Sequence, residues 1–225
     1  RFTLRGSYSL TGTPPDPSYS SSTTVFRAGN PFRIYGEDRE PVIGISQVGN
    51  ATLTYEKKNE FNFGFDAGLW KNRIGVTFDV YTRNNFDEMG IMVTQGLGGE
   101  VERAANVAEM RSNGMELSIS STNIKTKDFS WNTSFVYSYS NTEITKLFNS
   151  GNVIALVSGT GFPKRGYPAR ALFSIPFVGI NDEGVPMVIN EKGKVTTDDI
   201  NFQERVHTDF LKYEGPTDPK FTGSL

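Results

Sequence analysis

The most regular part of the chain is a run of alternating apolar and polar residues between Glu60 and Tyr81. Successive side chains of a β-strand point to opposite faces, so this alternation predicts two strands that each carry one apolar and one polar face. The alternation breaks at residues 70–73, where Lys71 and Asn72 provide a predicted tight turn. The stretch is therefore predicted to form an antiparallel hairpin, a unit that the rest of the chain repeats.

The same alternation marks further strands along the chain. The predicted strands lie near residues 1–10, 51–69, 74–82, 110–124 and 129–140, with the start of another at 221–225. Long connections cover residues 11–50, 83–109 and 141–220. Within them, helix propensity favours short helices over Val101–Ala108 and Thr197–Phe210, and Asn181–Gly184 predicts a hairpin turn.

The order of the connections is long, short, long, short, long. Alternate connections of an antiparallel meander lie at the same end, so all the long ones are expected at one end of the sheet. Short turns at one end and long loops at the other are typical of outer-membrane barrels. We therefore predict an all-β fold, an antiparallel meander of transmembrane β-barrel strands with long extracellular loops, as a partial segment of a larger barrel. The alternative is a soluble β-sandwich with an aromatic core.

Composition narrows the function only slightly. The 225 residues carry a formal charge of -2, which gives no basic surface for nucleic acid, and contain no cysteine for disulfides or thiolate metal sites. No apolar run is long enough for a membrane-spanning helix. The strand pattern begins at Arg1 and resumes just before Leu225, so we expect this chain to be a segment of a longer protein.

Candidate chemistry is sparse. The only histidine, His207, has no cysteine partner and is expected to be a surface residue. Asp182 and Glu183 could ligate calcium, but the spacing of a calcium-binding loop is absent, which favours a plain turn. We therefore predict no catalytic residue, no cofactor and no metal, and a protein that is not an enzyme.

Two groups of residues are candidates for contacts with other molecules. Loop aromatics could stack on a sugar or contact a peptide, or could pack loop against loop; these are Phe32, Tyr35, Phe162, Tyr167 and Phe173. Charged residues on the polar, lumen-facing side are Arg5, Asp66, Asp79 and Glu116. We expect these acidic residues to pair with Arg5 or with residues that fill the barrel.

Several motifs, taken together in their order and spacing, resemble the SusC/RagA group of TonB-dependent outer-membrane transporters. In chain order they are Tyr55-Glu56-Lys57-Lys58, Asn62-x-Gly64-x-Asp66, Asn72-Arg73, Asp79-x-Tyr81, Asn106 to Met110, Asn113 to Glu116, Phe129-Ser130-Trp131, Asn141 to Leu147, Tyr213 to Pro216 and Pro219 to Gly223. The resemblance covers most of residues 54–147 and is patchy elsewhere.

This resemblance implies a barrel of about 22 strands in the bacterial outer membrane, surrounded by lipid. It also implies an N-terminal plug, a motif that engages TonB, and a SusD-like surface lipoprotein that acts as a lid. The substrate would be an oligosaccharide or a peptide too large for porins. The chain itself contains neither plug nor TonB motif, so it would supply barrel wall and extracellular loops. The remaining alternatives are a passive outer-membrane porin and a soluble β-sandwich glycan-binding module.

Overall fold

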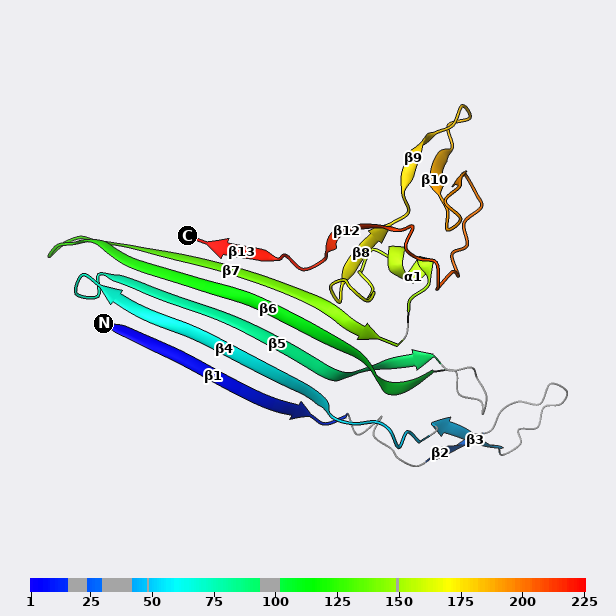
Figure 1. The fold of residues 1–225 in the computed structure, drawn as a ribbon, viewed down its shortest axis with the longest axis horizontal. Helices are drawn as coiled ribbons and strands as arrows, with labels where there is room; N and C mark the ends of the chain where they lie inside the picture. The colour runs from blue at the N-terminus through cyan, green and yellow to red at the C-terminus, as the bar shows by residue number, and fades with distance from the viewer. Residues whose placement is uncertain (16–23, 30–41, 48, 94–101, 149) are drawn as a thin grey trace.

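The sheet that organises the molecule has six antiparallel strands (Figure 1). The computed structural model describes residues 1–15, 24–29, 42–47, 49–93, 102–148 and 150–225. The sheet order is β1 (Phe2–Thr13), β4 (Glu56–Leu69), β5 (Ile74–Val93), β6 (Glu102–Lys125), β7 (Ser130–Leu147) and β13 (Phe221–Ser224). Neighbours in this order are also neighbours in sequence among the long strands, so the predicted antiparallel meander is confirmed.

The pairing register gives the sheet one apolar and one polar face. Residues that face each other across antiparallel strands share a face, so each row of partners has one chemical character. One apolar row crosses five strands through Leu4, Phe65, Phe78, Leu117 and Tyr137. The adjacent polar row crosses all six strands through Arg5, Gly64, Asp79, Glu116, Ser138 and Thr222.

The apolar face has no cover among the described elements. Phe2 and Tyr8 on this face are 64% and 65% exposed, and Phe61 on the next strand is half exposed. A soluble β-sandwich would bury such residues under a second sheet. An apolar band open to its surroundings is instead the arrangement of a barrel wall in lipid.

The two ends of the sheet differ as the connection lengths predicted. The tight turn at residues 70–73 and the turn between Lys125 and Ser130 lie at one end, on the left of Figure 1. The three long connections leave from the opposite end. The first of them contains a small hairpin of β2 (Val25–Gly29) and β3 (Val42–Gln47). Phe32 and Tyr35 lie outside the described residues.

The central strands run further than the alternation indicated. β5 continues to Val93 and β6 begins at Glu102, so most of the expected loop 83–109 is paired strand. The short helix expected over Val101–Ala108 is therefore wrong. The alanines there favour a helix in isolation, but Ala105 pairs with Gly90 and is buried, so tertiary pairing overrides local propensity.

The third long connection folds into a unit of its own, residues 150–216, which we call the loop domain. Its elements are α1 (Val153–Val157), β8 (Ala171–Ser174), β9 (Phe177–Ile180), β10 (Pro186–Ile189), β11 (Val195–Thr196) and β12 (Lys212–Pro216). α1 and the β8–β12 pair enclose a core of Val153, Leu156, Ala171, Phe173 and Leu211. No helix of the described residues is long and apolar enough to cross a membrane.

Turns in the loop domain are built by side chains that bind backbone N–H groups. The predicted hairpin turn after β9 is confirmed: Asn181 Oδ1 accepts from the N–H groups of Glu183 and Val185 at 3.0 and 2.8 Å. Asn190, fully buried, accepts from Lys192 and Lys194 in the same way. Such local bonds compete with helix formation.

The helix expected over Thr197–Phe210 is wrong for this reason. Thr196 Oγ1 accepts from the N–H groups of Asp198 and Asp199, and Asn201 Oδ1 accepts from Gln203 N. Backbone donors that a helix would use are thus satisfied by side chains, and the segment forms successive turns.

The fold predicts a strong requirement for glycine at position 114. A Cβ there would lie 2.5 Å from Tyr139 O and 2.6 Å from Tyr81 Oη, whereas a Cβ at Gly6 would meet nothing within 4 Å. We expect Gly114→Ala to destabilise the full-length protein by roughly 1–3 kcal/mol, and Gly6→Ala by well under 1 kcal/mol. Urea unfolding in detergent, followed by tryptophan fluorescence, measures both. Equal effects of the two substitutions would contradict the register.

Candidate functional site: the polar face and the loop domain

An ion-pair cluster occupies the polar face of β1, β4 and β5, in the half of these strands nearer the short turns. Arg5 Nε lies 2.9 Å from Asp66 Oδ2, and Arg5 Nη2 lies 2.9 Å from Asp79 Oδ2. Thr77 Oγ1 also donates to Asp66 at 3.0 Å. Gly64 separates Arg5 from Asp79 in the row of strand partners, and a Cβ there would overlap the Asp79 carboxylate. The glycine therefore lets the aspartate reach across β4.

Glu116 continues this row on β6. It is the strand partner of Asp79 and of Ser138. No ion pair found among the described residues includes it. The structure thus brings Arg5, Asp66 and Asp79 together in one cluster and places Glu116 beside them. The expectation that these acidic residues pair with Arg5 is met for the two aspartates.

Tyr81 fills the polar face one step nearer the loop end. Its ring lies over Gly114, and its hydroxyl lies 3.1 Å from Ser140 Oγ on β7. Arg83 lies above the Tyr81 ring at 5.4 Å and pairs with Glu60 at 2.8 Å. The polar face is therefore held together by side chains that bridge neighbouring strands, in the manner of an interior surface.

Asn106 fixes the loop end of the sheet, a role that sequence reasoning missed. Its Nδ2 donates to Thr54 O and Asp87 O, and its Oδ1 accepts from Thr54 N at 2.8 Å. Asp87 has a positive φ of 57° within a bulge of β5, and its carboxylate pairs with Lys57 at 2.8 Å. The presence of Asn106 in one of the matching motifs was the only signal for this crosslink.

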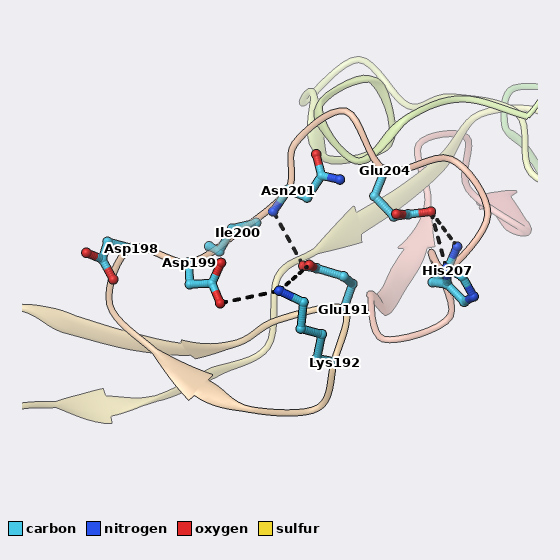
Figure 2. Close-up of a pocket in the computed structure, with 8 residues that line it drawn as sticks. All are labelled: Glu191, Lys192, Asp198, Asp199, Ile200, Asn201, Glu204 and His207. Atoms are coloured by element: carbon cyan, nitrogen blue, oxygen red, sulfur yellow. Dashed lines mark hydrogen bonds and ion pairs between the residues drawn. The ribbon is translucent and has the colours of Figure 1, made fainter.

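A polar pocket of about 570 Å³ opens in the loop domain (Figure 2). Its lining comes from the turn after β10 and from the segment 198–207, and comprises Glu191, Lys192, Asp198, Asp199, Ile200, Asn201, Glu204 and His207. Lys192 Nζ lies 3.6 Å from Asp199 Oδ2 and 3.8 Å from Glu191 Oε1. Four carboxylates and one ammonium make this lining acidic, so it suits ligands that donate hydrogen bonds, such as hydroxyl or ammonium groups.

Glu204 shapes one wall of this pocket. Its Oε1 accepts from the backbone N–H groups of Arg205, Val206 and His207 at 3.1, 2.8 and 2.9 Å. These bonds, chiefly those from His207 and Val206, hold the pKa of Glu204 below its usual value of 4.5. His207 is exposed, as predicted, and its Nδ1 lies 3.5 Å from the same carboxylate oxygen.

Three of the aromatic candidates lie inside the loop domain and pack on one another. The Tyr167 ring meets Phe173 edge to face at 5.0 Å, and Phe162 packs against the same core. Phe173 is only 6% exposed. Lys164 lies over both the Tyr167 and Phe173 rings. In this structure the three residues stabilise the loop domain, and their contact with a ligand stays a prediction.

Comparison with known proteins agrees with this geometry. The family profile described as "TonB dependent receptor-like, beta-barrel" matches residues 1–172. TonB-dependent receptor P39 of Formosa agariphila is 31% identical over 167 residues, which cover 73% of this chain and 14% of that protein. TonB-dependent receptor SusC of Bacteroides thetaiotaomicron is 29% identical over 164 residues, or 66% of this chain and 16% of that protein.

Solved structures give the same result over nearly the whole chain. The structure of the RagAB peptide transporter superposes with a TM-score of 0.74 at 27% sequence identity, covering 99% of this chain and 24% of that one. The RagAB peptide importer in the "open-open" state also gives 0.74, at 26% identity. The chain thus spans only a small part of the length of these relatives.

A two-faced antiparallel sheet with its long loops at one end is the wall segment of a β-barrel. The family match makes this barrel one of the TonB-dependent class. The chain belongs to the TonB-dependent receptor-like β-barrel family, and its relatives place it with the SusC/RagA type.

The ion-pair cluster predicts the behaviour of Arg5→Met. Without its cation, the cluster leaves Asp66 and Asp79 close together and uncompensated. We expect the free energy of unfolding of the full-length protein to fall by about 1–2 kcal/mol, a modest cost because Arg5 and Asp66 are nearly half exposed. Adding Asp66→Asn and Asp79→Asn to Arg5→Met should restore most of the lost free energy of unfolding, as measured by urea titration. If stability is not restored, repulsion between the two aspartates is not the cause of the loss.

The Glu204 turn predicts a local effect with a defined pH dependence. Glu204→Ala should speed tryptic cleavage after Arg205, because three backbone donors lose their acceptor. Glu183→Ala, in the turn after β9, is the matched control and should leave that cleavage rate unchanged. The pKa of Glu204 is depressed when folded, so its contribution is complete above pH 4.5 and is lost as the pH falls through the folded pKa. Amide exchange of residues 205–207, corrected for intrinsic rates, should report this loss.

Proposed function

We propose that this chain is part of an outer-membrane transporter that imports oligosaccharides or peptides in a TonB-dependent manner. The observation that carries the proposal is the match of residues 1–172 to the TonB-dependent β-barrel family, on a sheet whose exposed apolar face suits lipid. The chain supplies wall strands and loops. The plug, the contact with TonB and the SusD-like lid belong to the whole protein and its complex.

The lengths of the strands support a membrane-spanning part and an extracellular part of the wall. A strand crosses the hydrocarbon core with about 9–11 residues, so β5 and β6, of 20 and 24 residues, extend well beyond it. The loop domain and the extended ends of β5 and β6 form an extracellular platform in this proposal. Substrate held there, under the lid, passes into the barrel once TonB displaces the plug.

The polar face would line the interior of the barrel. Its small and neutral residues leave room for a solute, and Arg5 offsets part of the negative charge of Asp66 and Asp79 within the wall. A wide polar surface of this kind suits passage of glycans or peptides. Glu116 is free in this proposal to meet a residue of the plug.

The pocket of the loop domain is the proposed substrate contact on this chain. Carboxylates accept strong hydrogen bonds from sugar hydroxyls and from the ammonium groups of peptides. The proposed contacts are Asp198 and Asp199, because Glu191 and Glu204 already accept hydrogen bonds from backbone N–H groups.

Growth and uptake of the native organism test the proposal. Deleting the gene should abolish growth on one class of oligosaccharides or peptides and leave growth on monosaccharides and amino acids intact. Loss of TonB should give the same defect. Uptake that persists without TonB would favour the passive porin, and recovery of the protein in the soluble fraction would favour the β-sandwich module.

The pocket variants refine this test once the substrate class is known. Asp198→Asn with Asp199→Asn should weaken substrate binding about tenfold, the usual effect of losing a hydrogen bond to a charged group. Glu183→Gln, on the neighbouring turn and outside the pocket, is the matched control. Isothermal titration of the full-length protein in detergent measures both. Unchanged affinity in the double variant would remove the pocket from the proposal.

A further inference from the structure

A cleft of about 630 Å³ lies at the short-turn end of the sheet, far from the loop domain. It is formed by the turn between β4 and β5 together with the end of β6, and its lining is Trp70, Lys71, Asn72, Arg73, Thr122 and Lys125. Each of these side chains can donate hydrogen bonds, and three carry a full positive charge. No carboxylate lines the cleft.

The three cations of the cleft have no anionic partner among the described residues. Across the part of the chain that the structure describes, no ion pair involves Lys71, Arg73 or Lys125. Arg5, by contrast, pairs with two aspartates, and Arg83 pairs with Glu60. The cleft therefore differs from these two sites in gathering positive charge without a carboxylate.

The backbone that presents these side chains is strained. Trp70, Lys71 and Asn72 have φ values of 47°, 56° and 64°, a left-handed conformation that non-glycine residues rarely adopt in succession. The turn is held by Arg73 N donating to Trp70 O at 3.2 Å and by Thr122 N donating to Arg73 O at 2.8 Å. Strain of this kind persists where the surrounding structure enforces it, and it concentrates at functional sites.

Arg73 also reaches a second cleft on the polar face. This neighbour, of about 320 Å³, is lined by Asn72, Arg73, Ser120, Ser121, Thr122, Asn132, Thr133 and Ser134. Its side chains are hydroxyls and amides, with Arg73 as the only charge. Arg73 therefore lies between a cluster of ammonium groups and a row of neutral hydrogen-bond donors.

We infer that the cleft around Arg73 is a binding site for a phosphate group. The planar guanidinium matches two phosphate oxygens at once, and the flanking ammonium groups and hydroxyls can bind the remaining oxygens. Such a phosphate could belong to the headgroup of a membrane lipid or be free in solution. Trp70, which lines the cleft and is 73% exposed, is an aromatic residue of the kind found at membrane interfaces, so a lipid is one of the two sources to test.

A lipid source rests on the proposed function, because only a barrel in the outer membrane brings this end near a phospholipid leaflet. Phosphate binding itself needs no transport and is measured on purified protein. A defect in uptake and a defect in phosphate binding are therefore separate results.

Isothermal titration of the full-length protein in non-ionic detergent tests the inference with three probes. These are inorganic phosphate, dihexanoyl phosphatidylglycerol and dihexanoylglycerol, which lacks the phosphate. We expect phosphatidylglycerol to bind and dihexanoylglycerol not to. The double variant Arg73→Gln with Lys125→Gln should lose about tenfold or more in affinity. Lys127→Gln, in the next turn but outside the cleft, should change affinity less than about twofold.

The outcomes separate the sources of phosphate. Binding of both phosphate and phosphatidylglycerol, weakened alike in the double variant, supports a site for free phosphate as well, whereas binding of the lipid alone assigns the site to the membrane. Equal binding of dihexanoylglycerol, or affinity unchanged by the double variant, overturns the inference. If the double variant fails to fold, Lys125→Gln alone and Arg73→Lys decide the matter: each should weaken binding about threefold or more, the second because lysine cannot contact two phosphate oxygens at once.

Discussion

The pairing register between β4 and β5 is the constraint on which the rest of this structure depends. The turn at residues 70–73 sets Leu69 opposite Ile74, and from there Phe65 meets Phe78 and Gly64 meets Asp79. A slip by one residue would exchange the two faces of the strand. Each neighbouring strand takes its register from this pair, so the strained turn decides which side of a six-stranded wall is apolar.

Glycines on the polar face leave space for side chains from the neighbouring strand or turn. Gly64 leaves space for the Asp79 carboxylate, Gly114 for the Tyr81 ring and Gly68 for the Asn72 side chain. In each case a polar side chain lies over a glycine of the sheet. Polar side chains of neighbouring strands therefore bind one another across the face, as Arg5 binds Asp66 and Asp79.

The sheet could be predicted because apolar and polar residues alternate with the two-residue period of a β-strand. Hydrophobic and polar residues alternate along β4 and β5 since one face meets an apolar environment, and this can be seen without coordinates. The prediction failed at Val101–Ala108, where the alanines carry helix propensity and only pairing with β5 makes them a strand. It also failed at Thr197–Phe210, where Thr196 and Asn201 take the backbone donors of the expected helix.

The candidate site was less predictable than the fold because it depends on contacts distant in sequence. Arg5 and Asp79 were both expected on the polar face, yet only the register shows that Gly64 lets them meet. Tyr167 and Phe173 were candidates either for ligand contact or for packing of loop against loop, and they lie against Tyr213 from the far end of the loop domain. Aromatic residues in a long loop do not reveal whether the loop has a core of its own.

The two ends of the wall differ in charge, with an acidic pocket in the loop domain and a basic cleft at the short turns, and they also differ in what holds them in place. Val153, Leu156 and Phe173 give this unit a core apart from the sheet's apolar face, and two backbone hydrogen bonds of Ile144 on β7, with Gly166 and Tyr167, tie it to the wall. The short turns have no such core, and their cations are fixed only by the backbone of the hairpin and its bond to Thr122. Substitutions in the loop domain can therefore alter ligand preference without disturbing the wall, whereas a change in the turn at 70–73 disturbs the wall and the basic cleft together.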